Sequence, residues 1–512
     1  MQAKRVIGAV LAVLLLTGLF AGCSGGETSS AGEPDTGQAS GNSEVTEEEP
    51  YEINYLYYVS AEHANQEAVS EAVNELAMEE LNMKVNLIPM TMGTYNSQIA
   101  LLLAGNEPLD IFPTTSTNFA TYIEAGNIVN LADHLDVMQE AVDIIGEEDV
   151  NACYIGDFLV GMPQMRERTS PAGLIVRKDI FEELGYSVED FQITTEDYSS
   201  FDQITQLFAD VKAAYPNMIA FDGTTIMATY TDNYVDNLGN MFGVLENYGQ
   251  TTEITNRFES EQYRAFCEIA REWFTKGYSS ADIAVNEDSG ETKMKAGNSF
   301  SFICGVKPNT AIEKYAQTGY EVEVIELGNQ RMRNTNSVSS GPIAIASASE
   351  DPEKAAIFMN WTYTSGEAND LINWGVEGQD WIETEDGLAA YPEGVDAGNV
   401  GYHNDFGWAY PNQFAGHAWD GNPADIWEQY ETYNTSTPPS MAFGFSFDST
   451  AVTDEIAQLT TVYDRYAKDI GFGVVEIEPA LEEFNAALYA AGLQTVMDEK
   501  QRQLDEWLAN QS

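Results

Sequence analysis

The pattern of apolar and polar positions divides the chain into a short apolar start, a polar stretch and a long periodic part. A predominantly apolar run covers residues 6–20, directly after Lys4 and Arg5. Residues 24–50 are rich in Ser, Gly, Thr and acidic side chains and contain no Lys or Arg. From Tyr51 onward, apolar residues recur with the periods of strands and helices, so only this last part is able to bury a core.

Strand and helix periods follow one another at the start of this part. Residues 51–60 alternate and are rich in aromatic side chains, as a strand would be, and residues 65–81 place apolar side chains at helical spacing. An apolar run at 84–88 predicts a second strand, so the three elements predict a βαβ unit and a parallel sheet. We expect a further helix over 95–104 and a buried strand over 109–112.

Polar side chains follow the predicted strands at their carboxyl ends. Thr115 and Ser116 come directly after the strand at 109–112, and Tyr57 and Tyr58 lie at the end of the first strand. Open α/β sheets bind ligands at the carboxyl ends of their strands. These four residues are therefore candidate ligand-binding residues.

The charge of the chain is strongly negative. Acidic residues number 82 and basic residues 23, which gives a formal net charge of −59. Binding of nucleic acid needs a basic face, and anionic membrane surfaces repel an acidic domain. We therefore expect no nucleic-acid partner, and we interpret the charge as a means of keeping an exposed domain soluble.

The first cysteine stands at the end of the apolar run. Lys4 and Arg5, the run at 6–20 and the small residues Ala21 and Gly22 before Cys23 predict a secretory signal peptide over 1–22. The segment resembles a bacterial lipobox, although Phe20 holds the place where Leu is common. The resemblance implies that Cys23 is acylated, with 23–50 as a disordered acidic tether; the alternative is plain secretion with a free thiol.

The later cysteines predict no disulfide framework. Cys153, Cys267 and Cys304 are odd in number and have neither CxxC nor metal-finger spacing. At most one bridge can form between them, and its pairing stays open. We expect neither a metal nor a cofactor.

Several segments of the chain resemble one family in order and spacing. The early and middle segments are LLLAGNEPLDIF (101–112), YIEAGNIVNLADHL (122–135), LVGMPQMRERTSPAGLIVRKDIFEELG (159–185), 294–305 and 341–361. The C-terminal segments are FGFSFD (443–448), TDEIA (453–457) and 484–507. Together they resemble the family 1 extracellular solute-binding proteins of bacterial ABC importers, the last three within a lipoprotein subgroup.

The resemblance implies a two-lobed α/β fold of the periplasmic-binding-protein kind, each lobe a mostly parallel sheet flanked by helices, with a hinge between the lobes. We place lobe one at 51–165 and 330–380 and lobe two at 166–329 and 381–512. The family also implies a monomer on the extracellular face of the cell membrane, held by its lipid anchor. Its partners would be the permease subunits of an ABC importer and a small polar ligand.

Tryptophans gather in one polar stretch and indicate a carbohydrate ligand. Trp374, Trp408 and Trp419, with Trp381 and Trp427 nearby, stand among Gly, Asn and Asp. An indole beside hydrogen-bonding neighbours suits the C–H faces and hydroxyls of a sugar. The alternative is that they fix long loops to a lobe; Trp361 and Trp507, in helical patterns, we assign to packing.

Two polar residues precede the predicted crossing between lobes. Gln164 and Arg166 are candidate ligand-binding residues for this reason. Arg166 would hold a ligand oxygen or neutralise a neighbouring acid, and the sequence leaves both roles open.

Enzyme motifs are missing from the sequence. From Tyr51 onward it contains no G-x-S-x-G, H-E-x-x-H, P-loop or G-x-G-x-x-G, and its four histidines are scattered. Paired carboxylates carry little weight in so acidic a chain. We therefore expect a binding protein for a sugar or oligosaccharide, with a peptide or other polar solute as the first alternative. A secreted glycoside hydrolase and a surface adhesin are the remaining alternatives.

Overall fold

The computed structural model describes residues 49–105, 107–114, 119–226 and 234–511. The predicted signal peptide, Cys23 and nearly all of the predicted tether lie outside the described residues, as do Thr115 and Ser116. The fold below is that of the unit Pro50–Ser512.

The first sheet contains the predicted βαβ unit. Its strands run in the order β10-β3-β1-β2, with β1 parallel to both β2 and β3 and with β10 antiparallel to β3. The strands and their connecting helices are β1 (Tyr51–Val59), α1 (Gln66–Leu81), β2 (Met83–Thr91), α2 (Met92–Gly105), β3 (Ile111–Pro113) and β10 (Ile343–Ile345). The predicted strand, helix, strand, helix and strand are confirmed.

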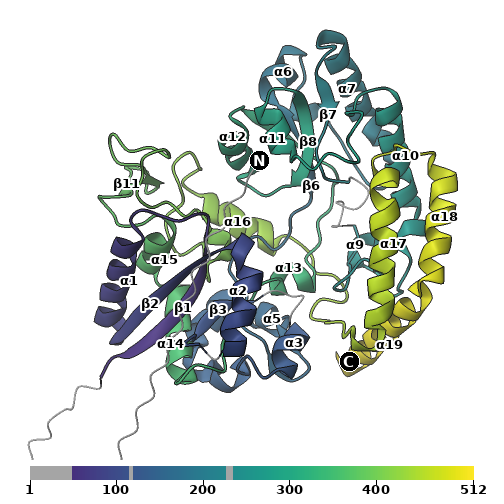
Figure 1. Ribbon diagram of the computed structural model, residues 1–512. Coiled ribbons are helices and arrows are strands. Elements are labelled where there is room, and N and C mark those ends of the chain that lie inside the picture. Colours follow the sequence, from purple (N-terminus) through teal and green to yellow (C-terminus); the bar gives the residue numbers. More distant parts are fainter. Residues whose placement is uncertain (1–48, 106, 115–118, 227–233, 512) are drawn as a thin grey trace, which may run out of the picture. The chain divides into compact units, whose positions relative to one another are not determined.

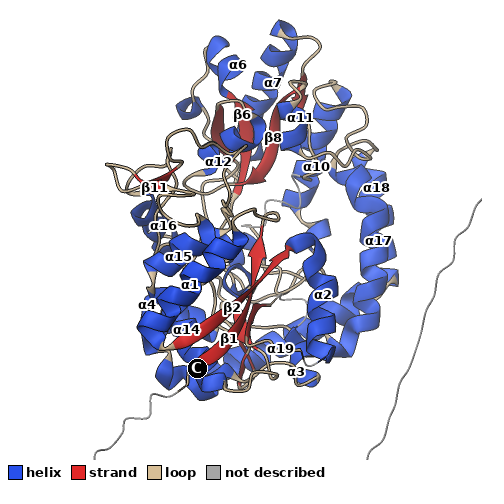
Figure 2. Ribbon diagram, turned by 60° about the vertical axis from the view of Figure 1, so that its left-hand side comes forward, coloured by secondary structure: helices blue, strands red, loops and turns tan. Residues whose placement is uncertain are grey.

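Alternation along β1 decides which helix covers which face of this sheet. Ile53 and Tyr55 belong to the apolar cluster that includes Val69 of α1. Leu56 points to the other face and belongs to the cluster that includes Tyr95 of α2. Both faces are buried, since α1 and α2 lie on opposite sides of β1 and β2 (Figures 1 and 2).

Short helices and helical turns complete the first lobe, by which we mean the first sheet and the elements packed on it. Trp361 on α14 is 7% exposed within the core of this lobe, so its predicted packing role is confirmed. The elements are α3 (Phe119–Glu124), the 3₁₀ helix Leu131–Val137, α4 (Gln139–Ile145), α5 (Glu147–Asn151), β4 (Tyr154–Ile155), β5 (Phe158–Leu159), α14 (Pro352–Thr364) and α15 (Gly366–Asn373).

The second sheet differs from the prediction in strand direction. Its order is β7-β8-β6-β9, formed by β6 (Ala172–Arg177), β7 (Ile219–Phe221), β8 (Ser299–Gly305) and β9 (Val322–Glu326). β7 and β8 are parallel, but β6 is antiparallel to both β8 and β9. The expectation of a mostly parallel sheet is therefore wrong for this sheet.

The direction of β6 follows from where the chain enters the second sheet. β6 comes straight from the first lobe, and its first residue, Ala172, pairs with Gly305 at the carboxyl end of β8. It therefore runs away from the edge at which β8 ends. β10 enters the first sheet in the same way, with Ile343 paired to Pro113 at the carboxyl end of β3.

The C-terminal helices pack on the second sheet's core and form the second lobe with it. Leu459, Phe484 and Val496 belong to the same apolar cluster as Leu174 of β6, and Figure 1 shows α17 and α18 running beside α10. The elements are α6 (Lys178–Glu183), α7 (Asp202–Ala214), α9 (Glu246–Gly249), α10 (Glu261–Thr275), α11 (Gly290–Lys295), α12 (Thr310–Thr318), α17 (Thr453–Gly471), α18 (Ile477–Ala490) and α19 (Leu493–Gln511), with 3₁₀ helices at Val188–Asp190, Tyr198–Phe201, Arg257–Glu259 and Thr450–Val452.

A buried lysine ties α19 to an irregular segment of the second lobe. The side chain of Lys500 is wholly buried, and its Nζ donates to the carbonyl oxygens of Asn237, Asn240 and Gly243 at 3.0, 2.8 and 2.7 Å. Burial lowers the pKa of Lys500 to about 7, against the opposing effect of Asp236. The terminal helix thus supplies hydrogen-bond donors to the carbonyl groups of residues 237–243, which form neither a helix nor a strand.

The sequence predicts that the stretch 381–433 belongs to lobe two, but part of it packs on the first lobe. Tyr402 and Tyr410 belong to the core cluster of the first lobe. The helix α16 (Ile426–Thr435) packs with Leu388 and Ala418, and short elements here are β11 (Ile382–Glu383), β12 (Ala389–Ala390) and the 3₁₀ helix Gly407–Ala409. Because this long segment contains only two very short strands, its sequence pattern does not predict which lobe it packs on.

The remaining sequence expectations concern cysteines and membrane spans. Cys153, Cys267 and Cys304 are free thiols in the described structure, the first two buried. Burial raises the pKa of the Cys304 thiol to about 12. Within the described ranges, no helix is both long enough and apolar enough to span a bilayer.

A buried carboxylate fastens two of the three crossing segments to the first lobe. Asp149 of α5 accepts Arg168 Nε at 2.7 Å and Arg333 Nη1 at 2.9 Å. Arg168 lies between β5 and β6, and Arg333 lies between β9 and α13 (Thr335–Ser339). The side chains of Asp149 and Arg168 are 7% and 4% exposed, so this ion pair lies away from water.

We expect Asp149→Ala to lower the free energy of unfolding by about 3–5 kcal/mol, because it leaves a buried guanidinium without its counter-charge. Urea unfolding followed by tryptophan fluorescence measures the loss. The matched control is Glu148→Ala, which removes the 61% exposed carboxylate on the other side of Arg333 and should cost less than about 1 kcal/mol. Equal losses in the two variants would contradict the role given to Asp149.

Candidate functional site

A cavity of about 590 Å³ lies where strands of both lobes end. Ser60 follows β1, and Lys307 and Asn309 follow β8, so both sheets present their carboxyl ends to it. The rest of the wall comes from α12, the end of α15 and the segment 403–430. The lining residues are Ser60, Glu167, Lys307, Asn309, Glu313, Ala316, Gln317, Asn369, Asn373, Trp374, His403, Asn404, Asp405, Phe406, Gly407, Trp408, Gln413, His417, Trp419, Asn422, Trp427 and Tyr430.

The structure brings the three predicted site tryptophans to this one cavity. Trp374 and Trp419 have ring centroids 4.9 Å apart, and His403 lies 4.3 Å from Trp419 and 5.2 Å from Trp374. Trp408 is half-buried further along the wall. Trp374 is only 6% exposed, so this indole contributes to packing as well as to the cavity wall.

The end of α15 sets the position of Trp374. The helix ends at Asn373, and Gly375 turns the chain with a φ of 96°, a conformation that an L side chain rarely adopts. The indole Nε1 of Trp374 donates to the carbonyl of His417 at 2.9 Å. His417 is itself held by Asp370, whose Oδ2 lies 2.6 Å from the ring Nδ1. This chain of contacts fixes the ring against the loop that carries Trp419.

Of the other predicted site residues, Tyr57 and Tyr58 are described by the structure and do not line the cavity. Tyr57 is buried, with its hydroxyl 3.3 Å from that of Tyr402 and 2.9 Å from Gln66 Nε2. Tyr58 packs on Tyr95, with ring centroids 4.8 Å apart. Both face the cores beside β1, because an inner strand points its side chains into the two helix layers rather than beyond its own end.

Gln164 and Arg166 lie behind the cavity wall. Gln164 is 4% exposed and is not a lining residue. Arg166 donates from Nη2 to Ser340 Oγ at 2.5 Å, and its guanidinium carbon is 5.8 Å from the ring centroid of Trp408. Burial lowers the pKa of Arg166, although Glu167 opposes the effect. Arg166 thus supports Trp408 from behind.

Amide side chains are the part of the site that the sequence analysis missed. Several buried polar atoms of the lining residues have no hydrogen-bond partner: Asn373 Oδ1, Gln413 Nε2, Asn422 Oδ1, His403 Nδ1 and Glu167 Oε2. Buried polar atoms in folded proteins are nearly always paired, so this group of unpaired atoms on residues that line one cavity is unusual and marks the cavity as a candidate site for a polar ligand. The sequence feature that could have predicted these residues is the high density of Asn, Gln and His between the tryptophans.

Asn404 connects the tryptophan segment to the first strand. Its Oδ1 accepts from Ser60 N at 2.8 Å, and its Nδ2 donates to the carbonyl of Tyr58 at 3.0 Å. This pair of bonds continues the end of β1 into the cavity wall. Tyr57 and Tyr58, predicted as ligand-binding residues, therefore lie at the end of the strand that leads to the cavity. The residues that this part of the structure contributes to the cavity wall come from 403–408.

The cavity is lined by one lysine, Lys307, and by three acids, Glu167, Glu313 and Asp405. Lys307 Nζ lies 2.9 Å from Glu313 Oε1 and 4.0 Å from Glu167 Oε2. Burial disfavours the charged amine, but these two carboxylates outweigh it and raise the pKa of Lys307. Desolvation by the surrounding protein, with repulsion from Glu313, raises the pKa of Asp405 to about 6, against the opposing effect of Lys307.

His403 is held in its neutral form within the aromatic wall. Burial, with a smaller contribution from His63, lowers the pKa of His403 to about 4. A neutral imidazole offers one donor and one acceptor. At neutral pH His403 therefore presents hydrogen-bonding capacity rather than charge to a ligand.

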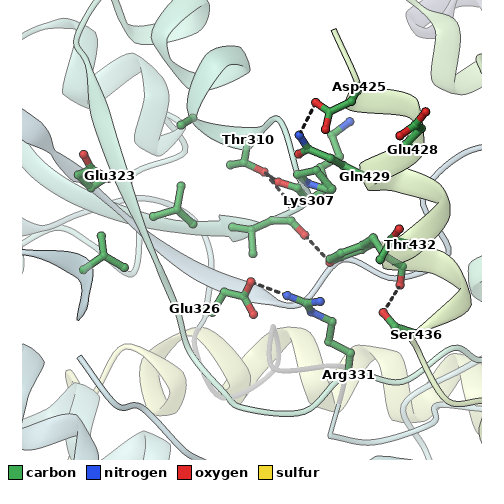
Figure 3. Close-up of a pocket in the computed structure, with 16 residues that line it drawn as sticks. Lys307, Thr310, Glu323, Glu326, Arg331, Asp425, Glu428, Gln429, Thr432 and Ser436 are labelled. Carbon is green, nitrogen blue, oxygen red and sulfur yellow. Dashed lines mark hydrogen bonds and ion pairs between the residues drawn. The ribbon is translucent and has the colours of Figure 1, made fainter. Parts of the chain in front are cut away.

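A second groove, of about 740 Å³, runs between β9, α12 and α16 (Figure 3). Several of its polar side chains pair with one another: Arg331 Nη2 donates to Glu326 Oε1 at 2.7 Å, and Gln429 Nε2 donates to Asp425 Oδ1 at 3.0 Å. None of its lining residues, all of which are described, has a buried polar atom without a partner. The smaller cavity, whose wall is both aromatic and unpaired, is therefore the candidate binding site.

Comparison with known proteins defines the class of fold. The fold is that of the two-domain solute-binding proteins. The N-glycan transport solute-binding protein NgtS from Streptococcus pneumoniae superposes with a TM-score of 0.79 at 17% identity, over 90% of this chain and 100% of that one. FusA, an S. pneumoniae ABC-transporter substrate-binding protein crystallised with kestose, gives a TM-score of 0.60 at 13% identity, over 90% and 100% of the chains.

Sequence comparison leads to the same class of protein. A carbohydrate ABC transporter substrate-binding protein of Streptococcus pneumoniae serotype 4 (strain ATCC BAA-334 / TIGR4) is 19% identical over 464 residues, which are 89% of this chain and 91% of the relative. Residues 441–509 match the family model described as a domain of unknown function, DUF3502. This match covers α17, α18 and nearly all of α19, which are the C-terminal helices of the second lobe. It includes none of the residues that line the cavity.

We expect Trp408→Ala to weaken ligand binding by about 2 kcal/mol, roughly thirtyfold in Kd, because it removes a half-buried ring from the cavity wall. The melting temperature should change little. Calorimetric titration and a thermal melt of the same sample measure the two effects.

Trp361→Ala is the matched control, since this ring is buried far from the cavity lining. It should lower the stability by about 3–5 kcal/mol and leave the affinity unchanged. Normal ligand affinity in Trp408→Ala would contradict the assignment of the cavity.

Proposed function

We propose that the protein is the extracellular solute-binding component of an ABC importer and that it captures a sugar or oligosaccharide in the cavity lined by Trp374, Trp408 and Trp419. The observation that carries the proposal is the composition of this wall. Flat indole faces alternate with amide and imidazole groups that lack partners. Sugars offer apolar C–H faces and hydroxyl groups, so one ring can satisfy both kinds of surface.

The comparisons support the same proposal. The similar proteins are transport proteins whose names include a carbohydrate, an N-glycan or kestose, and they are named as binding proteins rather than enzymes. In the proposal, the cavity binds its ligand without chemical change and the protein presents it to permease subunits. The crossing segments at 163–171 and 328–342 would act as the hinge on which the lobes close.

Carbohydrates should stabilise the purified protein against heat, whereas peptides should not. Thermal melts with a mannosyl-N-acetylglucosamine disaccharide, kestose, maltotriose and a tripeptide series test this expectation. A ligand present at 100 times its Kd adds about 2.7 kcal/mol to the free energy of unfolding.

Trp408→Ala provides the control, because its melting temperature should not respond to the same sugar. Stabilisation by peptides and by none of the sugars would replace the proposal with peptide uptake. Release of shortened sugars during incubation would indicate a glycoside hydrolase.

The proposed location is the outer face of the cell membrane, with Cys23 as the acylated residue. It rests on the apolar run at 6–20, the small residues Ala21 and Gly22, and the polar stretch 24–50. An importer's binding protein works close to its permease, and a flexible tether after an acylated cysteine would keep it there.

Cys23→Ser should move the protein from the membrane fraction to the medium or leave the precursor uncleaved, because the acyl acceptor is lost. Fractionation followed by immunoblotting and metabolic labelling with a fatty acid measures the change. Cys304→Ser, which alters another cysteine of the same chain, should leave the membrane fraction and the label unchanged. Unchanged labelling in Cys23→Ser would place the lipid elsewhere.

A further inference from the structure

Carboxylates surround the one Lys or Arg side chain among the cavity's lining residues. The acidic lining residues are Glu167, Glu313 and Asp405, and the cation is Lys307. Lys307 already lies 2.9 Å from Glu313 and 4.0 Å from Glu167. A ligand carboxylate would therefore meet an excess of negative charge and a cation whose partners are in place.

Arg166 does not add a free cation to the cavity. Its guanidinium carbon lies 5.8 Å from the ring centroid of Trp408, and its Nη2 donates to Ser340 Oγ. It is not a lining residue of the cavity.

Unpaired polar atoms of the lining side chains are a second observation that points to a ligand. Asn373, 1% exposed, and Asn422 each leave Oδ1 without a hydrogen-bond partner. Gln413, 9% exposed, leaves Nε2 as an unpaired donor. The unpaired amide oxygens, together with the carboxylates, favour a ligand that offers hydrogen-bond donors.

We propose that the cavity selects glycans by charge, accepting neutral and amine-bearing oligosaccharides and excluding those that carry a uronate, sialate, sulfate or phosphate near the bound rings. Hydroxyl and ammonium groups donate to the acceptors of the wall, whereas an anionic group faces Glu167, Glu313 and Asp405. The inference rests on the proposed function, in which the ligand is a carbohydrate. The net charge of −59 adds long-range repulsion of anions.

Matched pairs of glycans test the charge selection. The probes are the mannosyl-N-acetylglucosamine disaccharide with its 6-phosphate, lactose with 3′-sialyllactose, and chitobiose with its N-deacetylated diamine, titrated calorimetrically into the purified protein. In every pair that binds, the acidic member should bind at least roughly tenfold more weakly than the neutral one, and the diamine at least as well as chitobiose. An acidic glycan that binds as tightly as its neutral partner overturns the inference and leaves the proposed function intact. Binding of none of the six counts against the proposed function, and the inference falls with it.

A charge variant separates the cavity's carboxylates from the overall charge of the protein. Glu313→Gln removes the acid nearest to Lys307, so the affinity ratio of acidic to neutral glycan should rise about five- to tenfold. The matched control is Glu321→Gln, an exposed acid outside the lining residues, which should leave the ratio unchanged. The rise should shrink in 1 M salt, where charges are screened beyond about 3 Å. The same ratio in both variants would overturn the assignment of selectivity to the cavity.

Discussion

The ion pairs of Asp149 are the constraint on which the arrangement of this protein depends. The Asp149 carboxylate pairs with Arg168 just before β6 and with Arg333 just after β9. It therefore ties both ends of the segment from β6 to β9, which forms the second sheet, to α5 of the first lobe. Asn434 adds a further tie, since its side chain bonds to the backbone of both Arg166 and Arg168. The crossing segments therefore begin from fixed positions.

Strand direction follows from these crossings, and the place of the cavity follows from strand direction. β6 and β10 enter their sheets beside the carboxyl ends of β8 and β3 and run antiparallel to them. The residues after β1 and β8 consequently face one space, where Ser60 and Lys307 lie. Open α/β sheets place ligands at such ends because the backbone there leaves regular pairing and side chains of successive loops converge.

The cavity wall combines rigidity with unmet hydrogen-bonding capacity. Trp374, His403 and Trp419 pack on one another, and Asn404 ties the same segment to β1. The unpaired atoms of Asn373 and Gln413 are thus held on a firm support, which lowers the entropy that binding costs. The groove beside α16 is larger, but none of its lining residues has a buried polar atom without a partner, and its Arg331 and Glu326 pair with each other.

The sequence by itself determined the βαβ start, the packing of Trp361, and the gathering of Trp374, Trp408 and Trp419 in one segment, because periodicity and local composition are properties of neighbouring residues. Tertiary structure decided the direction of β6, the place of 402–410 in the first lobe and the burial of Tyr57 and Tyr58. It also decided that Asn373, Gln413 and Lys307 share a cavity. Residues as far apart in the chain as Ser60 and Trp408 meet there through three chain crossings, and no local pattern encodes which loops those crossings bring together.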